Sequence, residues 1–236
     1  MDEEWSNILM QFDMNRLENE IGYVFKDKML LKRALTHTSY ANEQKINKNG
    51  HYERLEFLGD AVLELLSSEY IFKANETMGE GAMTKLRAAI VCEPALAQCA
   101  KEIELSEFIL LGKGESAMGG RKRDSIVSDV LEALIGALYL DGGIEVARKF
   151  VHQYVLKDIE QKQLVYDAKS SLQEFVQKNK KGQIKYLLLS ESGPEHEKEF
   201  CCAVEIDEKR MGMGIGRNKK EAEQKAAAEA LFLLKK

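Results

Sequence analysis

The sequence has few residues that interrupt helices or cross-link a chain. It contains two prolines, four cysteines and no run of about 18 apolar residues. Scarce proline favours long helices, because proline removes a backbone donor from a helix interior. Without a long apolar run, we expect no membrane-spanning helix. Residues 1–4 are acidic or apolar and lack the basic start of a secretory signal peptide.

The cysteines argue against two further classes of protein. Cys92, Cys99, Cys201 and Cys202 form no Cys-x-x-Cys pair, and adjacent residues of a strand point to opposite faces. They predict buried thiols in a reducing compartment rather than a disulfide framework or a zinc site. We therefore expect a cytoplasmic protein.

Charge is distributed unevenly along the chain. The formal net charge is -5 and the pI is about 5.6, which argues weakly against a nucleic-acid binder. Residues 167–236 nevertheless carry 14 Lys+Arg and 12 Asp+Glu, whereas the rest of the chain carries 20 and 27. An acidic front and a mildly basic tail indicate two domains with different functions. Domains of about 100–200 residues are usual, so one large or two modest domains fit this length.

The first 156 residues have helical periodicity almost throughout. Apolar residues recur three and four positions apart, for example in 30–35, 55–66 and 130–138. Asp141-Gly142-Gly143 should separate two helices, and the Gly- and Lys/Arg-rich residues 112–123 predict a loop. Residues 157–166 are polar and predict a linker. We therefore expect a helical domain over residues 1–156.

The pattern changes after the linker. Residues 171–179 predict a short helix, residues 184–190, 200–206 and 211–215 predict strands, and residues 218–234 predict a long amphipathic helix. Asn218 is a suitable N-cap for that helix, with Glu221 in capping-box spacing. The predicted fold class is thus mostly α, an all-helical domain followed by a small α+β domain of order α-β-β-β-α over residues 167–236.

Two of the predicted helices carry acidic edges. Glu53, Glu56 and Asp60 share one face, because they are three and four residues apart. Asp129 and Glu132 are three residues apart on an apolar helix. Carboxylates from two helices could converge on a magnesium ion, which prefers oxygen ligands. Solvated helix faces are the other explanation, and spacing alone does not separate the two.

The same residues resemble the signature of the ribonuclease III family. The similarity covers roughly residues 20 to 145 and resumes after the linker. Its segments are Leu35-Thr36-His37-Thr38-Ser39-Tyr40, Glu53 to Ala61, Gly112-Lys113-Gly114-Glu115, Gly119-Gly120-Arg121, and Ser125-Ile126 followed by Asp129, Glu132-Ala133 and Gly136-Ala137. A long signature with several ordered segments is more specific than any single motif.

The resemblance implies roles for the acidic residues. The positions that match the family's metal ligands are Glu56, Asp60, Asp129 and Glu132, with Asp60 and Glu132 as catalytic residues. The expected cofactor is Mg²⁺, for which Mn²⁺ should substitute. Glu53 and Glu80 match supporting positions in the catalytic valley, although Glu80 could equally be a loop residue beside flexible glycines.

The resemblance also implies an activity and an assembly. The family hydrolyses one phosphodiester bond in each strand of double-stranded RNA by metal-activated water. The products have 5′-phosphate and 3′-hydroxyl ends and two-nucleotide 3′ overhangs, and the usual substrates are precursors of ribosomal and other RNAs. The family acts as a homodimer through the helical domain. Phe57 matches a residue that inserts into the partner subunit, and an ordinary core phenylalanine is the alternative.

Three segments of the tail domain follow one another in a specific order: Leu172-Gln173-Glu174 on the first helix, Gly193-Pro194-Glu195-His196 between the first two strands, and Asn218-Lys219-Lys220 at the start of the last helix. With its α-β-β-β-α order, this domain resembles a double-stranded-RNA-binding domain. Such domains recognise the shape of A-form RNA through 2′-hydroxyls and phosphates. The positions that the resemblance assigns to RNA contacts are Gln173, Glu174, His196, Asn218, Lys219 and Lys220. An exposed loop histidine and a solvated helix end are the alternatives for His196 and for the lysine pair.

Three functions remain to be compared. The first is a metal-dependent endonuclease of double-stranded RNA. The second is a protein that binds structured RNA without cutting it, and the third is a hydrolase of another phosphate ester. The four intact carboxylates favour the first over the second, and the RNA-binding domain argues against the third.

Overall fold

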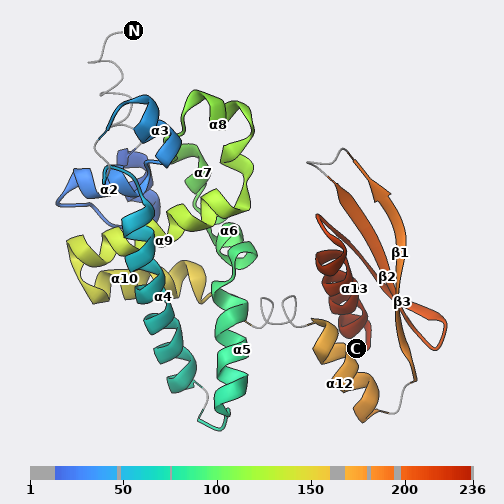
Figure 1. Ribbon diagram of the computed structural model, residues 1–236. Coiled ribbons are helices and arrows are strands. Elements are labelled where there is room, and N and C mark those ends of the chain that lie inside the picture. Colours follow the sequence, from blue (N-terminus) through green and yellow to red (C-terminus); the bar gives the residue numbers. More distant parts are fainter. Residues whose placement is uncertain are drawn as a thin grey trace. The chain divides into compact units, whose positions relative to one another are not determined.

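The first part of the chain, whose periodicity predicts helices, forms a set of packed helices in the computed structural model (Figure 1). The structure describes residues 14–46, 49–74, 76–159, 168–179, 182–193 and 198–234. The chain separates into two units, Met1–Lys157 and Asp158–Lys236. Most of the predicted linker lies outside the described residues, so its limits at 157 and 166 stay predictions.

The described part of the first unit is built of helices, as the periodicity predicts. Residues 14–21 are helical. The elements that follow are α2 (Lys28–Ala34), α3 (Thr38–Glu43), α4 (Glu53–Ala74), α5 (Glu80–Val91), α6 (Glu93–Glu102), α7 (Leu105–Phe108), α8 (Lys113–Ala117), η1 (Gly120–Lys122), α9 (Asp124–Gly142), α10 (Ile144–Phe150) and the π-helical turn η2 (Val151–Val155).

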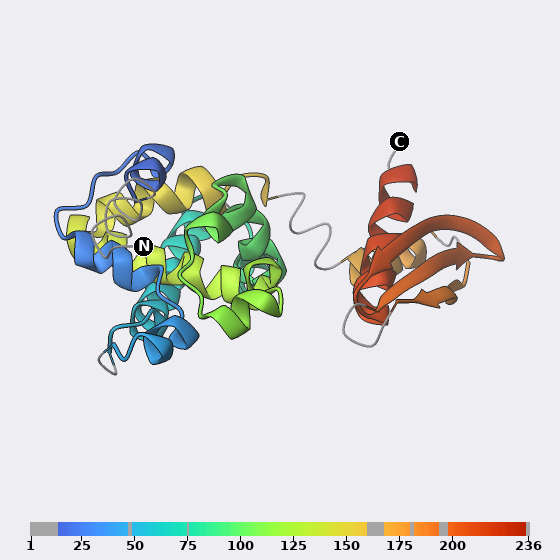
Figure 2. The same cartoon turned by 90° about the horizontal axis from the view of Figure 1, so that it is seen from above.

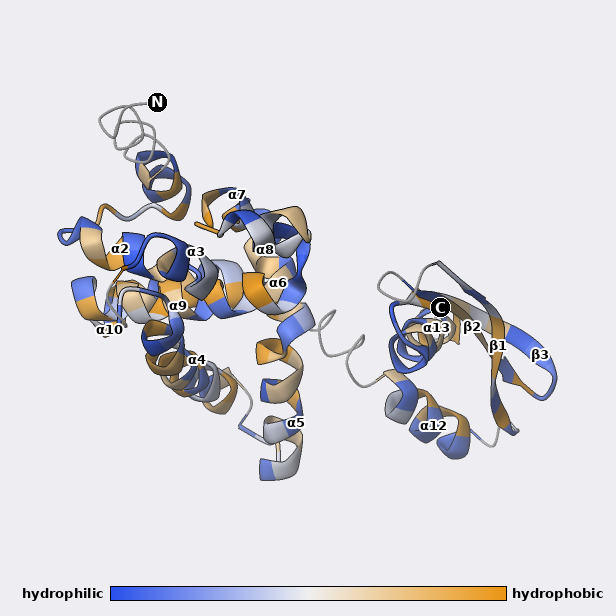
Figure 3. Ribbon diagram, turned by 45° about the horizontal axis from the view of Figure 1, so that its top comes forward, coloured by the Kyte–Doolittle hydropathy of each residue, from blue (hydrophilic) through white to orange (hydrophobic). Residues whose placement is uncertain are grey.

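Helix α9 is the central element of this unit. It buries apolar residues around most of its circumference, because α2, α4, α6 and α10 all pack against it. Its most extensive contact is with α4. Helix α4 carries hydrophobic residues along its length among hydrophilic ones (Figure 3).

Two glycines allow α4 and α9 to approach at backbone distance. A Cβ atom built on Gly59 of α4 would lie 1.8 Å from the carbonyl oxygen of Glu132, and one on Gly136 of α9 would lie 2.3 Å from that of Leu55. Real Cβ atoms essentially never come within 3.0 Å of such a neighbour. The two acidic edges predicted from sequence therefore lie on helices that contact each other directly.

Of two connections predicted between helices, one is confirmed and the other is wrong in part. Gly143, with φ of 82°, separates α9 from α10 where the Asp-Gly-Gly segment predicts a break. The prediction of a loop over residues 112–123 is wrong in part, because this segment contains α8 and η1. Its lysine, glutamate and alanine residues have adequate helix propensity, and its glycines mainly flank the helical turns.

The second unit has the predicted α-β-β-β-α order. Its elements are α12 (Ala168–Lys178), β1 (Ile184–Ser192), β2 (Glu199–Ile206), β3 (Lys209–Gly216) and α13 (Lys219–Leu234). The strands form an antiparallel sheet of order β1-β2-β3. Both helices lie on one face of that sheet (Figures 1 and 2).

Small residues bring α13 directly onto the sheet. Cβ atoms built on Gly212 and Gly214 of β3 would lie 2.4 Å and 2.3 Å from the carbonyl oxygens of Ala226 and Ala222. The capping prediction is confirmed at the start of α13. The Asn218 side chain accepts from Glu221 N–H at 2.9 Å, as an N-cap does, and the Glu221 carboxylate accepts at 2.9 Å from the N–H of Arg217, one residue before the cap.

The structure bears on the expectations about membrane-spanning helices and about the cysteines. Among those residues, no helix is long and apolar enough to cross a membrane. No disulfide joins the four cysteines, all of which are described; Cys99 and Cys202 are buried, and Cys92 and Cys201 are half-buried. The cytoplasmic location stays a prediction.

Candidate active site

The close crossing of α4 and α9 brings acidic residues of the two helices together. Glu56 lies one turn before Gly59 on α4, and Asp129 and Glu132 lie on the facing part of α9. Each of the three side chains offers a carboxylate oxygen within 4.8 Å of the others, and all three residues are half-buried. Three of the four predicted metal ligands are thus grouped by the fold.

Asp60 lies beside this group without belonging to it. Its side chain is exposed. Its charge is nevertheless close enough to raise the pKa values of Glu56 and Glu132. A fourth carboxylate therefore borders the three-carboxylate cluster of Glu56, Asp129 and Glu132.

The cluster has unusual proton affinity. Burial, followed by repulsion from Asp60 and Asp129, raises the pKa of Glu132 to about 8. Burial and repulsion from Asp129 and Glu53 raise the pKa of Glu56 to about 7. Burial also raises the pKa of Asp129. Desolvation and like charges both disfavour ionisation of carboxylates at such short distances. A bound cation or bound protons reduce this repulsion.

Tyr52 and His37, to which the sequence assigned no role, adjoin the cluster. The Tyr52 hydroxyl donates to Asp129 Oδ2 at 3.3 Å, and Tyr52 is only 5% exposed. The His37 ring lies against the Tyr52 ring, with 5.7 Å between centroids. The available signal was the place of Tyr52, immediately before the acidic signature, but its partner on α9 could be found only from the fold.

The supporting residues lie in different places. Glu53 is exposed at the start of α4, where His51 Nδ1 is 3.7 Å from its carboxylate. Glu80 is exposed in the first turn of α5 and accepts from the Thr84 hydroxyl at 3.1 Å. Within this chain Glu80 borders the second half of α4, beside Phe72, and not the cluster. Its place in a catalytic valley stays a prediction.

Phe57 is not a core residue of this chain. Its side chain is 81% exposed on α4. Leu65 and Phe72 of the same helix are 60% and 71% exposed. An apolar helix surface of this kind marks an interaction site in many proteins.

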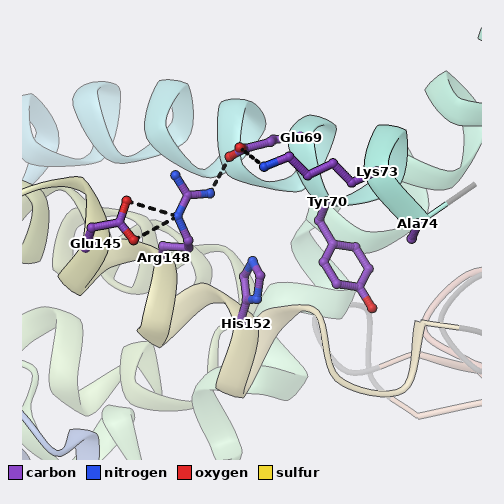
Figure 4. A pocket seen from close by; sticks show the side chains of 7 residues that line it. All are labelled: Glu69, Tyr70, Lys73, Ala74, Glu145, Arg148 and His152. Atoms are coloured by element: carbon purple, nitrogen blue, oxygen red, sulfur yellow. Dashed lines mark hydrogen bonds and ion pairs between the residues drawn. The ribbon is translucent and has the colours of Figure 1, made fainter.

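The chain also has a cavity of about 510 Å³ away from the cluster. It lies between the second half of α4 and the segment formed by α10 and η2 (Figure 4). Arg148 bridges Glu69 and Glu145 there, and Lys73 pairs with Glu69 at 2.5 Å. These charges neutralise one another, so this cavity resembles a structural ion-pair network more than a reactive site.

The cluster suits a hard divalent cation. Its donors are carboxylate oxygens from two rigid helices, with neither thiolate nor imidazole among the three. Magnesium and manganese take such ligands, whereas sites for softer metals use sulfur and nitrogen donors. The observed donor set is therefore consistent with the predicted Mg²⁺ or Mn²⁺.

The predicted RNA contacts lie on the two helices of the second unit. Gln173 and Glu174 are exposed on α12, and Lys219 and Lys220 are exposed in the first turn of α13. Asn218, also exposed, is the cap of α13. Of these predicted contacts, His196 alone lies outside the described residues.

The two helices are tied together near their starts. Lys169 of α12 pairs with Glu223 of α13 at 2.5 Å, and the Lys169 N–H donates to Gln224 at 2.9 Å. The exposed polar residues of α12 and the lysines of α13 are thus held on one connected framework.

Comparison with known proteins decides the family. Residues 27–159 match the family model described as Ribonuclease-III-like, and residues 168–234 match the double-stranded RNA binding motif. A protein named Ribonuclease 3 from Shouchella clausii is 51% identical over 215 residues, which are 90% of this chain and 83% of that protein. The chain belongs to the ribonuclease III family. Ribonuclease 3 from Oceanobacillus iheyensis is 50% identical and covers 93% of this chain, with 97% of its own length matched.

A solved structure of the ribonuclease III family agrees with the helical unit. The nuclease domain of ribonuclease III from Campylobacter jejuni is 44% identical, with a TM-score of 0.56. The match covers 61% of this chain and 96% of that one. That structure is described as flexible in a region involved in dimer formation. Family and fold therefore identify the present chain as a ribonuclease III endonuclease, an enzyme class that acts on double-stranded RNA.

Proposed function

We propose that the chain hydrolyses one phosphodiester bond in each strand of double-stranded RNA, using a divalent cation held by Glu56, Asp129 and Glu132 with Asp60 beside them. The observation that carries this proposal is the convergence of carboxylate oxygens from α4 and α9 within 4.8 Å. Membership of the ribonuclease III family supports it.

Each carboxylate has a task that follows from its surroundings. With pKa values of about 7 and about 8, Glu56 and Glu132 must lose their protons when a cation binds near neutral pH. Asp60 adds negative charge at the exposed side of the cluster and strengthens the attraction for the cation. A bound Mg²⁺ supplies an activated water nucleophile and neutralises charge on the phosphodiester.

The second unit would hold the duplex. Gln173 and Glu174 offer polar groups for 2′-hydroxyls in a minor groove, as in other domains that recognise A-form RNA. Lys219 and Lys220 lie at the N-terminus of α13, where the helix dipole adds to their positive charge. We assign phosphate contacts to this lysine pair, a supporting contact to Asn218 and a second minor-groove contact to His196.

A homodimer would place two such sites on one duplex. The 81% exposed Phe57 and its exposed neighbours on α4 offer an apolar surface for a second copy. We propose that Phe57 inserts into the partner subunit. Two sites related by the dimer axis would leave staggered cuts with two-nucleotide 3′ overhangs and 5′-phosphate and 3′-hydroxyl ends. Precursors of ribosomal and other RNAs in the cytoplasm are the proposed substrates.

The experiment is incubation of the purified protein with a long, end-labelled RNA duplex. Parallel reactions contain Mg²⁺, Mn²⁺ or EDTA. Short duplexes with two-nucleotide 3′ overhangs, formed with either metal and absent with EDTA, are the expected result. Duplex binding without cutting under every condition would instead favour an RNA-binding regulator.

A further inference from the structure

Tyr52 contacts both of the helices that carry the carboxylate cluster. It is the residue immediately before α4, and its carbonyl oxygen accepts from the N–H groups of Leu55 and Glu56 at 2.7 and 3.0 Å. Its side chain reaches across to α9. The same residue thus fixes the start of the helix that carries Glu56 and contacts Asp129 of the facing helix.

The contact with Asp129 is directional. The Tyr52 hydroxyl donates to Asp129 Oδ2 at 3.3 Å. A carboxylate has two oxygens, so a hydrogen bond that occupies one of them limits rotation of the group and leaves the other oxygen for a cation. Among the described residues, no other side chain donates a hydrogen bond to a carboxylate of the cluster, and Tyr52 donates to Asp129 alone of the three.

The tyrosine is itself held firmly in place. Its N–H donates to Thr36 O at 3.0 Å, and its ring packs against that of His37. His37 in turn accepts from Ser39 N–H at Nδ1, at 3.1 Å, and Ser39 Oγ accepts from Gly112 N–H at 2.9 Å. Groups that orient metal ligands work best when packing and hydrogen bonds fix their own positions.

We propose that Tyr52 is a positioning residue for the metal site, holding the Asp129 carboxylate in the orientation that the cation requires. This inference rests on the proposed metal-dependent function. Removal of a group that orients a metal ligand typically costs 10–100-fold in metal affinity or activity. Tyr52→Phe deletes the hydroxyl and keeps the ring that packs against His37, so we expect a loss of Mn²⁺ affinity of about tenfold.

Tyr23 provides a matched control. Its hydroxyl donates to Asp141 Oδ2 at 2.7 Å, which is a bond of the same chemical type in the same unit. Asp141 is absent from the carboxylate cluster. Tyr23→Phe should therefore reproduce the general cost of losing a tyrosine–aspartate hydrogen bond without changing Mn²⁺ affinity.

The experiment is a titration of RNA-free full-length protein with Mn²⁺, following the free ion by electron paramagnetic resonance. Thermal denaturation of each variant sets a temperature at which all are folded. Weaker Mn²⁺ binding by Tyr52→Phe alone supports the inference. A second readout is the Mg²⁺ concentration that gives half-maximal cleavage, which should rise in Tyr52→Phe and stay unchanged in Tyr23→Phe.

The possible failures can be distinguished. Equal Mn²⁺ affinity in wild type and Tyr52→Phe would overturn the positioning role and leave the metal site intact. An equal loss in both tyrosine variants would also overturn it, because the effect would then be one of general stability. No Mn²⁺ binding by the wild type in this titration, or wild-type binding that Glu132→Gln leaves unchanged, would overturn the proposed metal site and this inference with it.

Discussion

Replacement of Gly59 by alanine is the perturbation whose effect the structure specifies most directly. The new methyl carbon would lie 1.8 Å from the Glu132 carbonyl oxygen and 2.6 Å from its carbonyl carbon. Ordinary van der Waals contact begins at 3.4 Å, so α4 and α9 must separate locally by more than 1 Å, a displacement estimated from steric overlap. Both obstructing atoms belong to the backbone, which no rotamer change can move aside.

The expected magnitude follows from overpacking of a close-packed interior. Such insertions typically cost about 1–3 kcal/mol, and the backbone contact places Gly59→Ala near the upper end, at about 3 kcal/mol. For a domain of this size class, about 2–4 °C of melting temperature is lost per kcal/mol, which gives a decrease of roughly 6–12 °C. The same separation moves Glu56 away from Glu132, so Mn²⁺ affinity should fall as well.

The assay is thermal denaturation followed by circular dichroism at 222 nm, with the Mn²⁺ titration on the folded variant. Gly81→Ala is the matched control, because a Cβ atom there meets nothing within 4 Å and the residue lies in helix α5. That substitution should be neutral or stabilising, since alanine has the higher helix propensity. Unchanged melting temperature and Mn²⁺ affinity in Gly59→Ala would refute the close crossing of α4 and α9.

Three further predictions concern pH, RNA and assembly. Because the pKa of Glu132 is raised to about 8 and that of Glu56 to about 7, the folded metal-free protein holds protons that the unfolded chain has released. Its melting temperature should therefore fall as the pH rises from about 5 to about 8, and less so in Glu132→Gln. Lys219→Ala with Lys220→Ala should weaken duplex binding in filter assays and lower the salt slope by about two. Phe57→Ala should raise the dimer dissociation constant about 30-fold in sedimentation experiments, as for an aromatic hot spot.

Each of these has a control and a contrary outcome. Lys209→Ala, at the start of β3 and away from the α13 N-terminus, should leave the salt slope nearly unchanged; equal losses would show that the RNA contacts are misplaced. Val24 is 67% exposed outside α4, and Val24→Ala should leave the dimer unaffected. A metal-free melting temperature that rises between about pH 6 and about pH 8 would contradict the assigned pKa directions.

The sequence predicted the elements better than it predicted their contacts. Three- and four-residue spacing identified the acidic edges of α4 and α9, because helix geometry alone places such residues on one face. Spacing within one helix carries no information about where another helix crosses it. The crossing depends on Gly59 and Gly136, whose role appears only when the two backbones are seen together.

The residues that the sequence missed or left open have the same explanation. Tyr52 precedes an acidic segment and has no periodic signal, and its partner Asp129 is 77 positions away. Glu80 matches a family position, yet within one chain it lies beside the second half of α4. The exposed side chain of Phe57 shows that it is a surface residue and not a core residue. Periodicity could not distinguish the two, because the residue borders an apolar face. Tertiary contacts decide all three cases.

The central claim is that the carboxylate cluster is the catalytic metal site of a double-stranded-RNA endonuclease. Its most direct test is single-turnover cleavage of a long RNA duplex by wild type and Glu132→Gln at saturating Mg²⁺, with duplex binding measured in EDTA. Glu132→Gln replaces one carboxylate of the cluster by an uncharged amide of the same shape. We predict that cleavage is abolished while duplex binding and dimerisation are retained. Cleavage by Glu132→Gln at the wild-type rate would contradict the assignment of the site.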